Sequence, residues 1–210
     1  MKKRCIYFSL LCFSAFWVSC ASSYKPINPS TMLFNNLSSD GDVAFSYRYD
    51  VLNLTRNKKY AKKETKKGIK VVAVSVTNNS GAPIVFGTDV RLYNGDREII
   101  PVAAQTAASE LKQSTLVYLL YGLLTFTTFN KTTTTNGYTR TESTPIGLFI
   151  GPPITIGNMA VSGSANKKFK TELMVNDIWG RQIASGETVK GLLSISEMGY
   201  NPLTIKKINK

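Results

Sequence analysis

Apolar residues that alternate with polar ones near both ends of the chain predict β-strands. In residues 43–51, VAFSYRYDV, the residues Val43, Phe45, Tyr47, Tyr49 and Val51 alternate with Ala, Ser, Arg and Asp. A period of two gives a strand one apolar and one polar face. Further segments typical of strands are KVVAVSVTN (70–78), ETVKGLLSIS (187–196) and PLTIKKI (202–208).

A turn between two of the expected strands has its own signal. Residues 84–93 and 97–102 flank Asn94-Gly95-Asp96. Asn-Gly between apolar alternations indicates a β-hairpin, because both residue types tolerate a positive φ. We therefore expect a β-rich domain built from residues 41–102 and 181–210.

The order of these segments resembles that of immunoglobulin-like β-sandwich domains found in bacterial lipoproteins of unknown function. The resemblance is carried by VSVTNNSGAPI (74–84), the hairpin after it and SGETVKGLLSI (185–195). Such a sandwich takes about 100 residues. The resemblance implies a mainly β fold, an immunoglobulin-like β-sandwich with a helical, apolar insertion (α+β overall). It implies no activity.

The insertion, about residues 103–180, lacks the alternation. Its first part has leucines at helical spacing, and its last part, 158–174, has apolar residues four apart, which predicts an amphipathic helix. Between them, Pro145, Pro152 and Pro153 argue against one continuous helix. We expect a helix, an irregular apolar return and a second helix. The quoted stretches YGLLTFTTFNKTTTT, PIGLFIGPPITIGNMA and ANKKFKTELM resemble a pattern in uncharacterised lipoproteins of Bacteroidetes-type bacteria.

The apolar run 115–129 is short for a membrane-spanning helix, which needs about 20 residues. The favoured interpretation is that it packs on the sandwich or on the 158–174 helix. The two alternatives are that it contacts or enters a bilayer, or that it is buried against a partner, since so apolar a stretch is not expected to face water.

The first 20 residues predict export. Lys2, Lys3 and Arg4 precede an apolar run, 6–18, as in a secretory signal peptide. Val18-Ser19-Cys20-Ala21 resembles the lipobox of bacterial lipoproteins, which implies a signal peptide over 1–19 and acyl chains on Cys20. The alternative is ordinary cleavage, which releases a soluble protein. Residues 21–40 contain Pro and scattered Ser and Asn, so we expect 20–40 to be the lipidated cysteine and a tether, followed by a domain over 41–210.

Composition excludes several kinds of site. The chain has no histidine, and its three cysteines are Cys5, Cys12 and Cys20. Metal sites made of His or Cys and Ser-His-Asp catalysis are thus not expected in the mature chain. No spacing of the acidic residues indicates an acid–base pair, and no phosphate-binding glycine motif is present. We expect no catalytic residue, no metal, no cofactor and no enzymatic activity.

The net charge of +13 points to anionic partners. It is concentrated in RNKKYAKKETKKGIK, residues 56–70, which form either a solvated loop or a surface that binds phosphate groups. The candidate residues for binding an anionic surface are Arg56, Lys58, Lys59, Lys62, Lys63, Lys66, Lys67 and Lys70. In an exported protein, anionic lipids, glycans or an envelope protein are better partners than nucleic acid, which we do not expect to be bound.

These observations favour a non-enzymatic envelope lipoprotein that acts by binding or scaffolding at a bacterial membrane through its acyl chains. Ala21 after the cysteine implies the outer membrane, by the rule for enteric lipoproteins. The main alternative is a membrane-active lipoprotein whose apolar insertion, about 115–156, enters a bilayer for assembly, export or permeabilisation.

Overall fold

The structure, a computed structural model, describes residues 20–208. The predicted signal peptide over 1–19 lies outside the described residues. The fold is mixed, with about 34% helix and 33% strand in four small, separate sheets. The described chain divides into two compact units. Unit 1 comprises residues 20–23 and 113–165, and unit 2 comprises residues 24–112 and 166–208.

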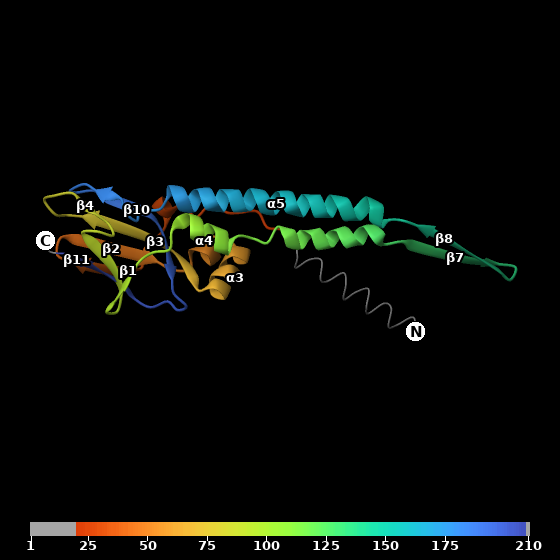
Figure 1. The fold of residues 1–210 in the computed structure, drawn as a ribbon, viewed down its shortest axis with the longest axis horizontal. Coiled ribbons are helices and arrows are strands. Elements are labelled where there is room, and N and C mark those ends of the chain that lie inside the picture. Colours follow the sequence, from red (N-terminus) through yellow and green to blue (C-terminus); the bar gives the residue numbers. More distant parts are fainter. Residues whose placement is uncertain (1–19, 209–210) are drawn as a thin grey trace. The chain divides into compact units, whose positions relative to one another are not determined.

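Unit 2 holds most of the strands (Figure 1). Its elements are η1 (Pro29–Thr31), β1 (Asn36–Asp40), β2 (Val43–Arg48), α2 (Val51–Leu54), α3 (Lys58–Lys67), β3 (Ile69–Asn78), β4 (Ile84–Val85), β5 (Val90–Asn94), β6 (Arg97–Ile99), α4 (Ala104–Leu111), β9 (Gln182–Ile183), β10 (Thr188–Ser196), β11 (Leu203–Lys207) and the end of α5 (Gly147–Val175).

The described strands of unit 2 form three antiparallel sheets. Their strand orders are β1-β2-β3-β10, β11-β5-β6 and β4-β9. They share a core in which Phe45, Phe86 and Leu92 are almost fully buried. The strands predicted from alternation and Val-rich runs are confirmed as β2, β3, β10 and β11, except that β2 ends at Arg48 and Val51 begins α2. The predicted hairpin joins β5 to β6, and its two turn residues are Gly95, at φ +59°, and Asp96, because Asn94 still pairs with Arg97.

The predicted immunoglobulin-like sandwich is wrong, since the sheets do not close into one. β4 and β9 pair only with each other among the described strands, so they extend neither larger sheet. The chain from Val51 to Lys67, which follows β2, forms α2 and α3, and α3 packs against β3. Helices therefore occupy a segment that a sandwich would give to loops or strands.

The segment expected to be a tether is packed into unit 2 from Tyr24 onward. The Tyr24 ring contacts the rings of Tyr60 and Phe169, with centroids 5.5 and 5.4 Å away. The Ile27 N–H donates to Glu172 Oε1 at 2.7 Å. Burial of aromatic surface and satisfied backbone groups both favour this packed course.

Unit 1 contains η2 (Leu116–Phe126, a 3-10 helix), β7 (Phe129–Thr135), β8 (Tyr138–Thr144) and residues 147–165 of α5. The prediction that prolines interrupt the insertion is wrong, because α5 runs through Pro152 and Pro153. These two residues cost the helix two backbone N–H donors. The acceptors that lose them are Leu148 and Phe149, in the first turn of α5, where the side chains are exposed.

No helix among residues 20–208 has both the length and the apolar character needed to cross a membrane.

Candidate functional site

Two helical segments of unit 1 carry no charged side chain. Residues 113–130 and 143–165 contain no Asp, Glu, Lys or Arg. They include η2 and residues 147–165 of α5, which together we call the apolar arm. In Figure 1, η2 is the green helix beside the first half of α5.

Small residues bring the two segments of the apolar arm together. A Cβ added to Gly151 would lie 2.5 Å from Thr125 Oγ1 and 2.7 Å from Thr125 N, so only glycine permits this approach. The Gly147 N–H donates to the Thr127 carbonyl at 2.9 Å. Further along, Ser162 Oγ donates to Thr115 Oγ1 at 3.3 Å. The contact thus uses backbone and small side chains rather than leucines.

The leucines of η2 point outward, contrary to the favoured interpretation from sequence. Leu120 is 66% exposed, and Tyr118 is the buried residue of this helix. The geometry explains the difference, since Gly147 and Gly151 of α5 meet the backbone of Leu124 and Thr125 and the Thr125 hydroxyl on η2. The large apolar side chains of the arm that remain exposed are Leu116, Val117, Leu119, Leu120, Leu123, Phe126, Leu148, Phe149, Ile150, Ile156 and Val161.

Cys20 lies at the rim of an apolar groove in unit 1. The groove has a volume of about 880 Å³. Its walls come from both segments of the arm and include Tyr121, Leu124, Ile150, Pro153, Ile154 and Val161. Cys20 itself is exposed.

Hydrogen bonds hold the chain after Cys20 against unit 1. The Ala21 N–H donates to Asn158 Oδ1 of α5 at 2.6 Å. The Gln113 side chain makes two hydrogen bonds to the backbone of Ser22. It accepts from the Ser22 N–H at 3.2 Å and donates to the Ser22 carbonyl at 2.7 Å. The position of Cys20 beside the groove is therefore fixed by Asn158 of α5 and by Gln113, which precedes η2.

Most of the basic stretch 56–70 forms α3 (Lys58–Lys67) rather than a loop, and Lys70 lies in β3. Gly68 ends the helix at φ +64°. Lys58, Lys62 and Lys66, spaced four apart, are exposed on one side of it, and Lys59 and Lys63, which come next to them, are half-buried. Residues four apart share a helix face, so the structure brings most of the predicted candidates together as one basic strip.

Three of the candidates lie apart from that strip or are engaged elsewhere. Arg56 is exposed but precedes the helix, at φ +61°. The Lys67 ammonium pairs with Glu110 at 2.7 Å. Lys70 is buried, with its ammonium 4.4 Å from the centre of the Tyr200 ring. A sequence pattern could not separate Lys70 from the others, because its burial depends on Tyr200 far along the chain.

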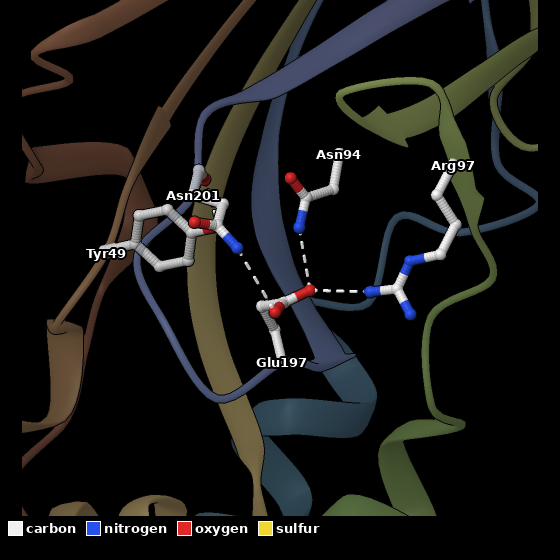
Figure 2. A network of polar contacts seen from close by, with 5 residues as sticks. All are labelled: Tyr49, Asn94, Arg97, Glu197 and Asn201. Carbon is white, nitrogen blue, oxygen red and sulfur yellow. Dashed lines mark hydrogen bonds and ion pairs between the residues drawn. The ribbon is translucent and has the colours of Figure 1, made fainter.

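Figure 2 shows a network of polar side chains in unit 2, which sequence reasoning missed. Glu197 Oε2 accepts hydrogen bonds from Asn94 and Arg97, each at 2.8 Å. Asn201 donates to Glu197 Oε1 at 3.4 Å, and the Tyr49 hydroxyl donates to the Asn201 carbonyl at 2.9 Å.

This network fastens the chain between β10 and β11 to the β5–β6 hairpin. Burial, with smaller contributions from Tyr47 and Glu197, raises the pKa of Tyr49, so its hydroxyl stays protonated and acts as a donor. Both oxygens of the Glu197 carboxylate already accept hydrogen bonds. The network therefore links the chain between β10 and β11 to β5, β6 and the residue that follows β2.

Within the described part of the chain, no group of His, Cys, Asp and Glu side chains is arranged to hold a metal ion. Comparison of the chain with known protein families, with curated proteins and with solved structures finds no match. The two surfaces that stand out are the apolar arm with Cys20 and the basic strip on α3.

Proposed function

We propose that the protein is a non-enzymatic, lipid-anchored protein of the bacterial envelope, and that its apolar arm contacts the bilayer. The observation that carries this proposal is the position of Cys20 on the rim of the apolar groove, held there through Ala21 and Ser22. Acyl chains on Cys20 would emerge beside uncharged helices. Anchor and apolar surface would then reach the membrane at the same place.

The exposed apolar side chains of the arm are the physical reason to expect that it contacts the bilayer. Monomeric proteins rarely expose large contiguous apolar patches, and those that do mark sites of protein or membrane contact. The leucines of η2 and Phe149 of α5, which is 77% exposed, belong to such a surface. A surface without charges also avoids the cost of bringing an ion into a hydrocarbon environment.

The basic strip on α3 supports a second contact, with anionic lipid or acidic envelope glycans. Lysines near an anionic membrane surface contribute about 1 kcal/mol each. The protein would act as a scaffold held at the membrane, and the residue after Cys20, Ala21, favours the outer membrane.

Mass spectrometry of the protein extracted from envelopes tests the anchor. The expected mature N-terminus is Cys20 carrying acyl chains. An unmodified N-terminus at any other residue would refute the anchor. It would not decide whether the arm binds lipid, which the next experiment measures.

Co-flotation with lipid vesicles tests the arm. The protein used is the chain from residue 20 onward with Cys20→Ser, which cannot carry acyl chains. Vesicle binding by this protein therefore reports the contribution of the arm. Replacing Leu119, Leu120 and Leu123 by Ser removes roughly 1 kcal/mol of hydrocarbon transfer per half-exposed leucine. Vesicle binding should then fall roughly 100-fold, since 1.4 kcal/mol is a factor of ten.

The matched control replaces three exposed leucines of unit 2 by Ser, namely Leu33, Leu37 and Leu54. This control should bind vesicles as the parent chain does. Equal binding by the two triple variants would contradict the proposed role of the arm.

A further inference from the structure

The β7–β8 hairpin of unit 1 has no covered face and no covered edge among the described residues. Every residue of both strands is exposed. Within residues 20–208, each strand pairs only with the other. Its turn is Asn136-Gly137, at φ +51° and +81°, as a two-residue hairpin turn requires. Isolated two-stranded hairpins are marginally stable in water, so a further strand would stabilise this one.

The two faces of the hairpin differ in chemistry. One face is a ladder of uncharged polar pairs, in which Thr132 and Thr134 hydrogen bond to Thr141 and Thr139, each at 3.1 Å. The other face carries the charges, and they are unevenly divided. β7 contributes Lys131 alone, which lies opposite Glu142, whereas β8 contributes Glu142 and also Arg140, which pairs with Glu142 at 3.4 Å.

The edge of β8 is complementary to itself. If two copies of β8 run antiparallel with Thr141 opposite Thr141, Arg140 of each copy lies opposite Glu142 of the other. Opposite charges directly across a strand pair are favourable, and like charges are unfavourable. The remaining residues brought opposite each other are Thr139 with Ser143 and Tyr138 with Thr144, which carry no charge.

The edge of β7 lacks this property. The same antiparallel arrangement about Thr132 would place Lys131 opposite Thr133, so no pair of opposite charges would form between the two copies. Open strand edges of high β-propensity pair with other chains unless charges or prolines prevent it. Here the charges on β8 favour a copy of the same strand.

We infer that two copies of this protein associate through β8, antiparallel and with a two-fold axis at Thr141, so that two hairpins form one four-stranded sheet. Such a contact is isologous, because the same patch serves both copies. The inference goes beyond the proposed function and does not depend on acylation of Cys20.

Disulfide cross-linking tests the register. In the full chain, kept in mild detergent with Cys5, Cys12 and Cys20 replaced by Ser, Thr141→Cys should form covalent dimers under mild oxidation. Directly opposite residues lie about 4.5–5.5 Å apart between Cα atoms, a distance that a disulfide spans. Thr139→Cys alone should not react, because the two copies of residue 139 would be offset by roughly 14 Å. Mixed with Ser143→Cys, it should.

Charge exchange tests the complementarity. In the Thr141→Cys background, Arg140→Glu alone and Glu142→Arg alone each place like charges opposite one another, so the yield of dimer should fall at least tenfold. Mixing these two variants, distinguished by size, should restore cross-linking between them. The chain that carries both changes should also regain it, since opposite charges again face each other.

Thr132→Cys on β7 is the matched control and should cross-link no faster than Thr139→Cys. Equal cross-linking by Thr132→Cys and Thr141→Cys, or a mixture of charge variants that does not recover, would overturn the inferred pairing.

Discussion

Replacing Glu64 by Gln should change how the stability of unit 2 depends on pH. Glu64 lies on α3 with only 3% of its surface exposed, and its Oε1 accepts a hydrogen bond from the Val71 N–H at 2.6 Å. Burial raises the pKa of Glu64 to about 7, although Val71 and Lys70 act in the opposite direction. Gln keeps the acceptor oxygen but does not titrate.

The magnitude follows from the difference in pKa between the two states. The unfolded value is 4.5 and the folded value is about 7. The folded protein therefore binds the proton more tightly, so this contribution to stability is fully present below pH 4.5 and is lost as the pH rises through 7. One pKa unit corresponds to 1.36 kcal/mol. The total loss is therefore about 3 kcal/mol.

Denaturant unfolding of the parent chain and of Glu64→Gln, at a series of pH values from 4 to 8.5, measures this effect. The variant should gain about 3 kcal/mol relative to the parent chain between the two ends of the series. A difference that does not vary with pH would refute the reasoning.

The control is Glu110→Gln. The Glu110 carboxylate is exposed, and its pairing with Lys67 lowers its pKa. Its contribution is present above the unfolded pKa and is lost as the pH falls through the folded value. Within the series, the pH dependence of this control should therefore be small, confined to the acid end and of the opposite sign.

Three further changes have expected outcomes. Neutralising the basic strip on α3 should weaken binding to anionic vesicles, most at low ionic strength, and should leave the melting temperature nearly unchanged; the residues to replace by Gln are Lys58, Lys62 and Lys66. Gly151→Leu should separate η2 from α5, and hydrogen exchange over residues 116–126 should then become faster. The control Gly157→Leu should leave the exchange unchanged, because a Cβ at position 157 meets nothing within 4 Å. Asn78→Ala should cost unit 2 several kcal/mol in denaturant unfolding, because the buried amide donates to the Ala82 and Ile183 carbonyls and accepts from Ser80.

The strands of unit 2 could be predicted because their signal is local. In β2, Val43, Phe45 and Tyr47 are buried and the residues between them are not. The assembly of strands into sheets is not local. The pairing of β3 with β10 joins residues more than 100 positions apart, and the strand pattern alone does not show that β4 and β9 pair only with each other among the described strands.

The β7–β8 hairpin was missed although its turn has the signal that located the β5–β6 hairpin. Asn136-Gly137 separates two runs of threonine and other polar residues. Threonine favours strands, but without apolar alternation the segment did not look like one. Its exposure on both faces explains why the usual pattern is absent.

The candidate site was only partly visible in the sequence. The lipobox-like context singled out Cys20, and the density of lysines singled out the segment that forms α3. The direction of the η2 leucines could not be predicted, because it depends on the contact that Gly151 makes with Thr125. The position of Cys20 beside the groove depends on Asn158 and Gln113, whose roles no spacing indicates.

A polarity-sensitive fluorophore on the apolar arm would report whether the arm contacts lipid next to the anchor. In protein whose Cys20 is acylated, as shown by mass spectrometry, the mature chain offers no competing thiol, since Cys5 and Cys12 lie in the predicted signal peptide. Leu120→Cys and, as the control in unit 2, Leu54→Cys are labelled and reconstituted into vesicles. We expect a blue shift in emission, and quenching by lipids with a nitroxide on the acyl chain, at position 120 but not at position 54. Equal emission and quenching at the two positions would contradict it.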